Sequence, residues 1–96
     1  MRLHPNEIEK IKKTILHHIR DATIILFGSR VDDDKRGGDI DLLVETGQTI
    51  TLRDKLKILT DLELNGIVRK VDLLIKSPQT HERTIIKSAR EEGIVL

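Results

Sequence analysis

The chain has 96 residues, 38% of them hydrophobic and 34% charged, which is the length and balance of a single globular domain, residues 1–96, built around one core. Its net charge of +1 indicates no partner by bulk electrostatics, and its lack of cysteine excludes disulfides, thiolate metal sites and a cysteine nucleophile. Because no apolar run approaches the ~20 residues of a membrane span and the N-terminus is too charged for a secretory signal, we expect no membrane association and a cytoplasmic location.

The first half of the chain predicts one helix and two strands. From Pro5 to Arg20, isoleucines recur at spacings of three and four between charged residues, which predicts an amphipathic helix. That stripe consists of Ile8, Ile11, Ile15 and Ile19. The β-branched and apolar run from Thr23 to Phe27 predicts a strand ended by Gly28. A polar loop separates it from a second strand, predicted over Asp39–Glu45.

The second half predicts a helix, a strand and a last helix. Thr51 to Asn65 has the composition of a helix, with Thr51 as its N-cap and Gly66 as its stop. Its apolar stripe is Leu52, Leu56, Leu59 and Leu62. A strand is predicted over Arg69–Ile75, and Ser77 is expected to cap a final helix that ends at Gly93 before a short apolar tail. This order predicts an α+β (α/β-like) fold, with one sheet and the helices packed on one face.

Two of the predicted strands carry the same pattern of apolar and acidic residues. Residues 40–44 read IDLLV and residues 71–75 read VDLLI. Because side chains alternate across a strand, the flanking apolar positions share one face, and Asp39, Asp41 and Asp72 point to the other. The carboxylates of Asp39 and Asp41 are then within ~7 Å of each other, and Asp72 joins them if its strand is the neighbour.

Three carboxylates on one face favour a metal site. Like charges raise each other's pKa unless a cation is present. Oxygen ligands without histidine or cysteine nearby in sequence favour Mg²⁺ or Mn²⁺ over zinc. The alternative is structural: Asp39 is then a turn residue after two glycines, and Asp41 and Asp72 are solvent-facing strand residues.

Gly28 and Ser29 stand between the first predicted strand and a segment that can wind into a short helix. A strand, a glycine and a helix N-terminus present free backbone N–H groups and a hydroxyl, which is a geometry that binds phosphate. The alternative is an ordinary turn in which Gly28 relieves steric crowding and Ser29 caps the helix. Considered together with the aspartates, the pair favours phosphate binding.

Gly28-Ser29-Arg30, followed after a short spacer by Gly38-Asp39-Ile40-Asp41 and an apolar strand, resembles a family signature. It is similar to that of the minimal nucleotidyltransferases of the DNA polymerase beta superfamily, in which a later strand brings a third aspartate. The resemblance covers essentially the whole chain. It implies the nucleotidyltransferase fold, with a small mixed β-sheet. The sequence departs from the pattern at Asp32–Asp34, where the family more often has small residues and a further glycine, and at Gly38, where serine is common.

The resemblance also implies a reaction and its residues. An acceptor hydroxyl attacks the α-phosphorus of a nucleoside triphosphate, here ATP, and pyrophosphate leaves. Two Mg²⁺ ions, which Mn²⁺ can replace, are implied on Asp39 and Asp41, with Asp72 as the third catalytic carboxylate and metal ligand. The residues implied to hold the triphosphate are Gly28, Ser29 and Arg30. Lys35 and Arg36 are further candidates for neutralising it.

Members of this size, the MntA-like antitoxins, are commonly paired with a small helical HEPN-type protein. That partner is a ribonuclease toxin, and these proteins act as its antitoxin. Some of them transfer AMP to one of its tyrosines. The resemblance therefore implies a protein adenylyltransferase that acts as an antitoxin, with its acceptor supplied by a homo- or hetero-oligomeric partner. Direct nucleic-acid binding is not expected, because Phe27 is the only aromatic residue and cannot build a base-stacking track alone.

Two other hypotheses remain open at this point. The chain can be a binding module that neutralises a toxin by contact and retains the metal site without using it. The acidic run Asp32–Asp34 favours this, because it weakens triphosphate binding unless nearby cations or a partner offset it. The chain can also be a structural α/β domain with solvated acids. The sequence leaves open the base preference, the acceptor and the oligomeric state.

Overall fold

The computed structural model describes residues 3–28 and 39–96. The phosphate-binding prediction for Ser29 and Arg30, the acidic run Asp32–Asp34 and the neighbouring Lys35 and Arg36 lie outside the described residues. Within the described part of the chain, no helix is both long and apolar enough to cross a membrane.

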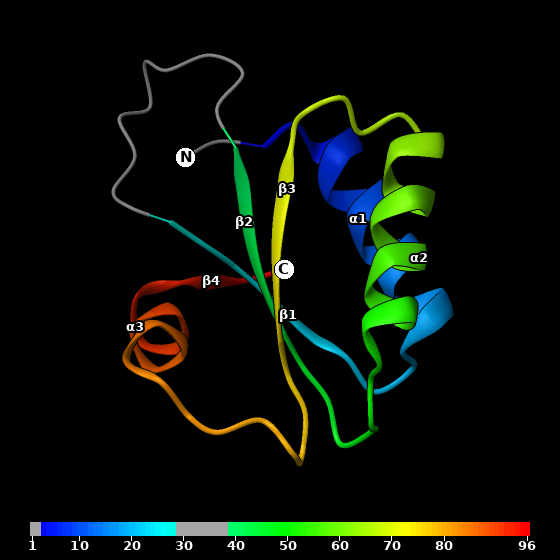
Figure 1. Ribbon diagram of the computed structural model, residues 1–96. Helices are drawn as coiled ribbons and strands as arrows, with labels where there is room; N and C mark the ends of the chain where they lie inside the picture. The colour runs from blue at the N-terminus through cyan, green and yellow to red at the C-terminus, as the bar shows by residue number, and fades with distance from the viewer. Residues whose placement is uncertain (1–2, 29–38) are drawn as a thin grey trace.

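Four strands form one mixed sheet in the order β3-β2-β1-β4 (Figure 1). In chain order the elements are α1 (Pro5–His18), β1 (Thr23–Phe27), β2 (Ile40–Glu45), α2 (Leu52–Leu64), β3 (Val71–Lys76), α3 (Thr84–Glu92) and β4 (Ile94–Val95). β1 pairs antiparallel with β2 and with β4, whereas β2 and β3 are parallel and α2 connects them. The predicted α+β class and mixed sheet are confirmed.

The main core lies between the sheet and the layer formed by α1 and α2 (Figure 1). Of the predicted isoleucine stripe, Ile11, Ile15 and Ile19 are buried there, whereas Ile8 is only partly buried. The helix itself ends at His18, so Ile19 is its C-cap. The three buried isoleucines meet Ile40, Leu42 and Val44 of β2. This face of the sheet is the one that the alternation of apolar residues predicts.

The sequence predicts that all helices pack on one face of the sheet, but the structure places them on both faces. α3 lies on the face opposite α1 and α2, where Ile86 and Ala89 pack on Ile25 and Leu43 (Figure 1). The reason is that the central strands are apolar on both faces at this level, so Ile25 and Leu43 also need a cover. The aspartate face is therefore only partly uncovered.

The second helix begins as predicted but buries a different face. Thr51 is its N-cap, accepting a hydrogen bond from the Asp54 backbone N–H at 3.1 Å, and Gly66 follows the helix with φ +99°. Leu52 and Leu56, however, are 70% and 54% exposed, whereas Ile58 and Leu62 are buried. The leucine stripe is wider than the contact with the sheet, and its N-terminal half faces solvent.

The last helix begins later than predicted. Residues 77–80 form a turn in which the Thr80 N–H donates to the Ser77 carbonyl at 3.0 Å, and α3 starts only at Thr84. A serine hydroxyl can satisfy a local turn as readily as it caps a helix, which is why Ser77 misleads here. The apolar tail that follows Gly93 is not a free end but the edge strand β4.

Candidate functional site

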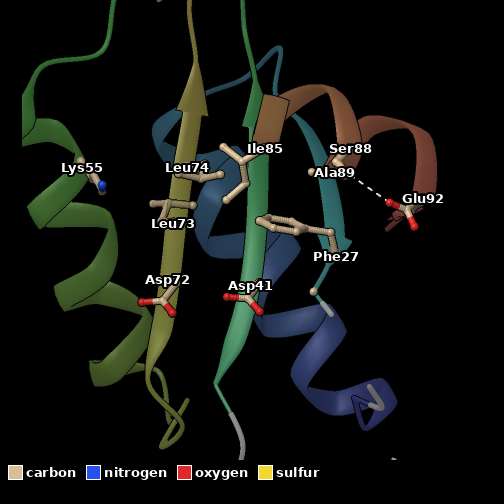
Figure 2. A pocket seen from close by; sticks show the side chains of 11 residues that line it. Phe27, Asp41, Lys55, Asp72, Leu73, Leu74, Ile85, Ser88, Ala89 and Glu92 are labelled. Carbon is tan, nitrogen blue, oxygen red and sulfur yellow. Dashed lines mark hydrogen bonds between the residues drawn. The ribbon is translucent and has the colours of Figure 1, made fainter. Parts of the chain in front are cut away.

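A row of three side chains crosses the sheet beside α3. In the sheet register Asp72 of β3 is paired with Asp41 of β2, which in turn is opposite Phe27 of β1. Paired residues of adjacent strands point to the same face. The next row on this face, Leu74, Leu43 and Ile25, is partly covered by α3. The aspartates thus lie just beyond the edge of that cover (Figure 2).

This row forms one side of a pocket of about 670 Å³. α3 contributes the opposite rim, with Ile85, Ser88 and Glu92 (Figure 2). Gly28, which directly follows β1, also lines the pocket. Lys55 of α2 is the one cationic side chain among the described residues that line it. The pocket therefore combines the paired carboxylates of Asp41 and Asp72, a third carboxylate on Glu92, an apolar wall and one cation.

Asp41 is a carboxylate of this site whose ionised form is disfavoured by its surroundings. Partial burial raises its pKa above the ordinary value, and the carboxylates of Asp72 and Asp39 raise it further. Lys70 approaches the pair, and its Nζ lies 4.0 Å from Oδ1 of Asp72. Since the Lys70 side chain is largely exposed, its charge is screened by water and offsets little of this repulsion. The negative charge of the carboxylates is therefore left largely uncompensated by Lys70.

The oxygen ligands fit a hard divalent cation. Two carboxylates from adjacent strands, with no nitrogen or sulfur ligand beside them, are the donor set that Mg²⁺ and Mn²⁺ accept, with water or substrate oxygens filling the remaining positions. Asp39 precedes β2 and acts on Asp41 through its charge. Within residues 3–28 and 39–96, no three acidic or histidine side chains form a compact cluster. Asp41 and Asp72 are thus the pair that the fold brings together.

Gly28 lies at the end of β1 in a backbone conformation that favours glycine. Its φ is +136°, which side chains with a Cβ rarely adopt. Gly28 also lines the pocket that Asp41 and Asp72 line. The predicted role of Gly28 in phosphate binding stays a prediction.

Sequence reasoning missed the contribution of α3 to the site. Ile85, Ser88 and Glu92 line the pocket only because α3 packs on the aspartate face, and that face was expected to be uncovered. The position of Phe27 beside Asp41 could have been predicted from the sequence. An antiparallel pairing of the first two predicted strands through the intervening loop places the end of one opposite the start of the other.

Polar contacts fix α3 in place at the far end of the pocket-bearing face. Arg90 donates from Nη2 to Oε2 of Glu45 on β2 at 2.8 Å and to Oε1 of Glu82 at 2.9 Å. Gly93 then lets the chain pass close to β1, since a Cβ at this position would lie 2.3 Å from Cγ2 of Ile25. Both features hold α3 over the row of Leu74, Leu43 and Ile25. Asp41 and Asp72 stay accessible beside it.

Comparisons with known proteins agree with this geometry. A family model described as "Polymerase beta, Nucleotidyltransferase" matches residues 9–96. Comparison with curated proteins gives no match.

Two solved structures share the fold. One is a chain of the complex of tri-AMPylated Shewanella oneidensis HEPN toxin with MNT antitoxin; it is 23% identical, with a TM-score of 0.69, over 94% of this chain and 67% of that chain. The other is a chain of the toxin–antitoxin pair MntA–HpeT with a tyrosine-to-alanine substitution; it is 22% identical, with a TM-score of 0.70, over 93% of this chain and 69% of that chain. At these identities the similarity shows the fold.

Proposed function

Because the chain belongs to the polymerase beta nucleotidyltransferase family, we propose that it transfers AMP from ATP to a tyrosine hydroxyl of a HEPN-type partner protein and so acts as an antitoxin. The observation that carries this proposal is the pairing of Asp41 with Asp72 in an open pocket on the sheet. Nucleotidyl transfer needs closely spaced carboxylates that hold a divalent cation at the reacting phosphate.

The proposed reaction is a displacement at the α-phosphorus of ATP. The acceptor oxygen forms a bond to the α-phosphorus while the bond from that phosphorus to the oxygen bridging to the β-phosphorus breaks. That oxygen leaves with pyrophosphate, and the hydroxyl proton passes to Asp72 or to water. When bound, Mg²⁺ lowers the pKa of the acceptor hydroxyl and neutralises charge on the leaving oxygen.

In this proposal Asp41 and Asp72 hold Mg²⁺ at the row beside α3, and Asp39 adds a third carboxylate at the start of β2. Gly28, with Ser29 and Arg30, binds the triphosphate. The carboxylates suit this role because partial burial, and then repulsion from Asp72 and Asp39, raise the pKa of Asp41, and a bound cation would offset both effects. The ionised carboxylates destabilise the metal-free fold. A cation that removes this destabilisation is bound more tightly for that reason.

The choice of acceptor is supported by the solved structures of similar fold. One contains an AMPylated HEPN toxin together with an MNT antitoxin, and the other carries a tyrosine-to-alanine substitution in a toxin–antitoxin pair. The pocket also opens to solvent beside Asp41 and Asp72, which suits a side chain presented by a docked protein. Docking then supplies the orientation of the acceptor.

The test is to incubate the chain with a HEPN-type partner, ATP and Mg²⁺ and to weigh the partner by mass spectrometry. We expect the partner to gain the mass of one or more AMP groups, and we expect Asp41→Asn and Asp72→Asn to abolish the gain. Glu63→Gln, at an exposed position of α2 outside the pocket, is the matched control and should behave as the unmodified chain. A partner that is bound and silenced without added mass, equally well by all variants, decides for neutralisation by contact.

A further inference from the structure

An apolar wall stands directly beside the carboxylate pair. Phe27 is the cross-strand partner of Asp41, and Leu74 lies two residues beyond Asp72 on the same face. Ile85 of α3 closes the wall from the opposite side and is 48% exposed although it lines the pocket (Figure 2). Apolar side chains that line a pocket together with a few polar groups are the usual lining of a ligand site.

We propose that Phe27, Leu74 and Ile85 form the subsite for the aromatic ring of the acceptor, and that this subsite selects a tyrosine over a serine or threonine hydroxyl. This inference rests on the proposed transfer to a tyrosine hydroxyl, and it assigns the residues of this chain that recognise the tyrosine ring.

The spacing on the sheet favours a phenol. Side chains of cross-strand partners start about 5 Å apart, so the ring of Phe27 begins one strand spacing from the carboxylate of Asp41. A phenol bears its reacting oxygen directly on the ring, and an oxygen placed at Asp41 and Asp72 therefore puts its ring against this wall. A serine or threonine hydroxyl brings no such group and leaves the wall exposed to water.

The polarity of the wall separates a phenol ring from a nucleobase. A base is joined to the α-phosphorus through its ribose, so it lies farther from the carboxylates, and its ring nitrogens need hydrogen-bond partners. The polar side chains that α3 offers are Ser88 and Glu92, and the Ser88 hydroxyl donates to Oε2 of Glu92 at 2.9 Å. Wall residues Phe27, Leu74 and Ile85 have no polar side-chain atoms, which suits the unsubstituted edges of a phenol and an offset or edge-to-face contact with Phe27.

The experiment uses N-acetyl-tyrosine amide as the probe, titrated into the isotope-labelled full chain and followed by NMR. We expect the backbone signals of Phe27, Leu74 and Ile85 to shift, and we expect N-acetyl-serine amide to leave them unchanged. Ile85→Ser should weaken binding of the tyrosine probe about tenfold, because the ring loses one apolar wall. Ile94→Ser, at a 63% exposed position of β4 outside the pocket, is the matched control.

The outcomes separate this inference from the proposed function. Shifts caused by adenosine in place of the tyrosine probe, or competition between that probe and ATP, would make the wall a base subsite and overturn the inference while the transfer reaction stands. Equal binding of the tyrosine probe by Ile85→Ser and Ile94→Ser would also overturn it. Binding of the tyrosine probe to a chain that binds no Mg²⁺-ATP would support the ring subsite and count against nucleotidyl transfer instead.

Discussion

Replacing Asp41 with asparagine should stabilise the metal-free protein. Partial burial and the neighbouring carboxylates raise the pKa of Asp41 above its ordinary value of 3.8, so the folded state holds this proton more tightly than the unfolded state does. The ionised carboxylate therefore destabilises the fold at neutral pH. Below the unfolded pKa both states are protonated and the destabilisation vanishes; it develops as the pH rises through the folded pKa.

The size of the effect follows from the register of Asp41 and Asp72. Carboxylates on paired residues of adjacent strands lie about 5 Å apart, and two unit charges at that distance repel by about 0.8 kcal/mol in water-like surroundings. The water-like value applies because Asp72 is exposed, and the partial burial of Asp41 adds to the cost of its ionised form. We expect Asp41→Asn to raise the free energy of unfolding at pH 7 by about 0.5–1 kcal/mol. This corresponds to a rise in Tm of about 2–6 °C for a domain of this size.

Thermal melts at pH 7 and pH 3, in the presence of a chelator, measure this effect. Asp41→Asn should be more stable than the unmodified chain at pH 7, and the difference should shrink at pH 3. Asp21→Asn is the control of opposite sign, because hydrogen bonds from Thr46 and Gly47 lower the pKa of Asp21 and its ionised form stabilises the fold. Lower stability of Asp41→Asn at pH 7, or a gain that persists unchanged at pH 3, would refute the electrostatic reasoning.

Three further substitutions test the local geometry. Gly28→Val should abolish Mg²⁺-ATP binding in calorimetry, because φ +136° disfavours a β-branched residue where the backbone lines the pocket; unchanged affinity would contradict the assignment. Gly93→Ala should lower the free energy of unfolding by about 1–3 kcal/mol in urea titrations, since its Cβ would collide with Ile25, and a neutral effect would show that α3 can shift. Thr51→Ala should cost about 1 kcal/mol by the same assay through loss of the hydrogen bond from Asp54, whereas Thr51→Ser should restore most of it.

The convergence of Asp41 and Asp72 could be predicted from sequence because two independent rules agree there. The repeated strand pattern places both residues on the same face, and the helix between the two strands predicts a parallel pairing in register. The N-cap at Thr51 was likewise predictable, since the capping signal is local. Agreement between a local pattern and a topological rule is what makes such predictions succeed.

The position of α3 could not be predicted because the central strands are apolar on both faces. Leu42 and Leu43 are adjacent and both fully buried, so alternation no longer tells which face a helix covers. The start of α3 was also predicted wrongly, because the Ser77 side chain forms a hydrogen bond within a turn and does not cap a helix. Residues that line the pocket from α3, such as Ile85, therefore became candidates only once the packing was known.

The most direct test of the central claim is to locate the divalent cation by paramagnetic relaxation. Mn²⁺ added with ATP to the isotope-labelled full chain should selectively broaden the NMR signals of Asp41, Asp72 and Phe27. Signals at the opposite end of the sheet, such as that of Glu45, should stay sharp, and Asp41→Asn should remove the effect. Broadening centred on other acids, or spread evenly over the chain, would contradict a metal site at the Asp41–Asp72 pair.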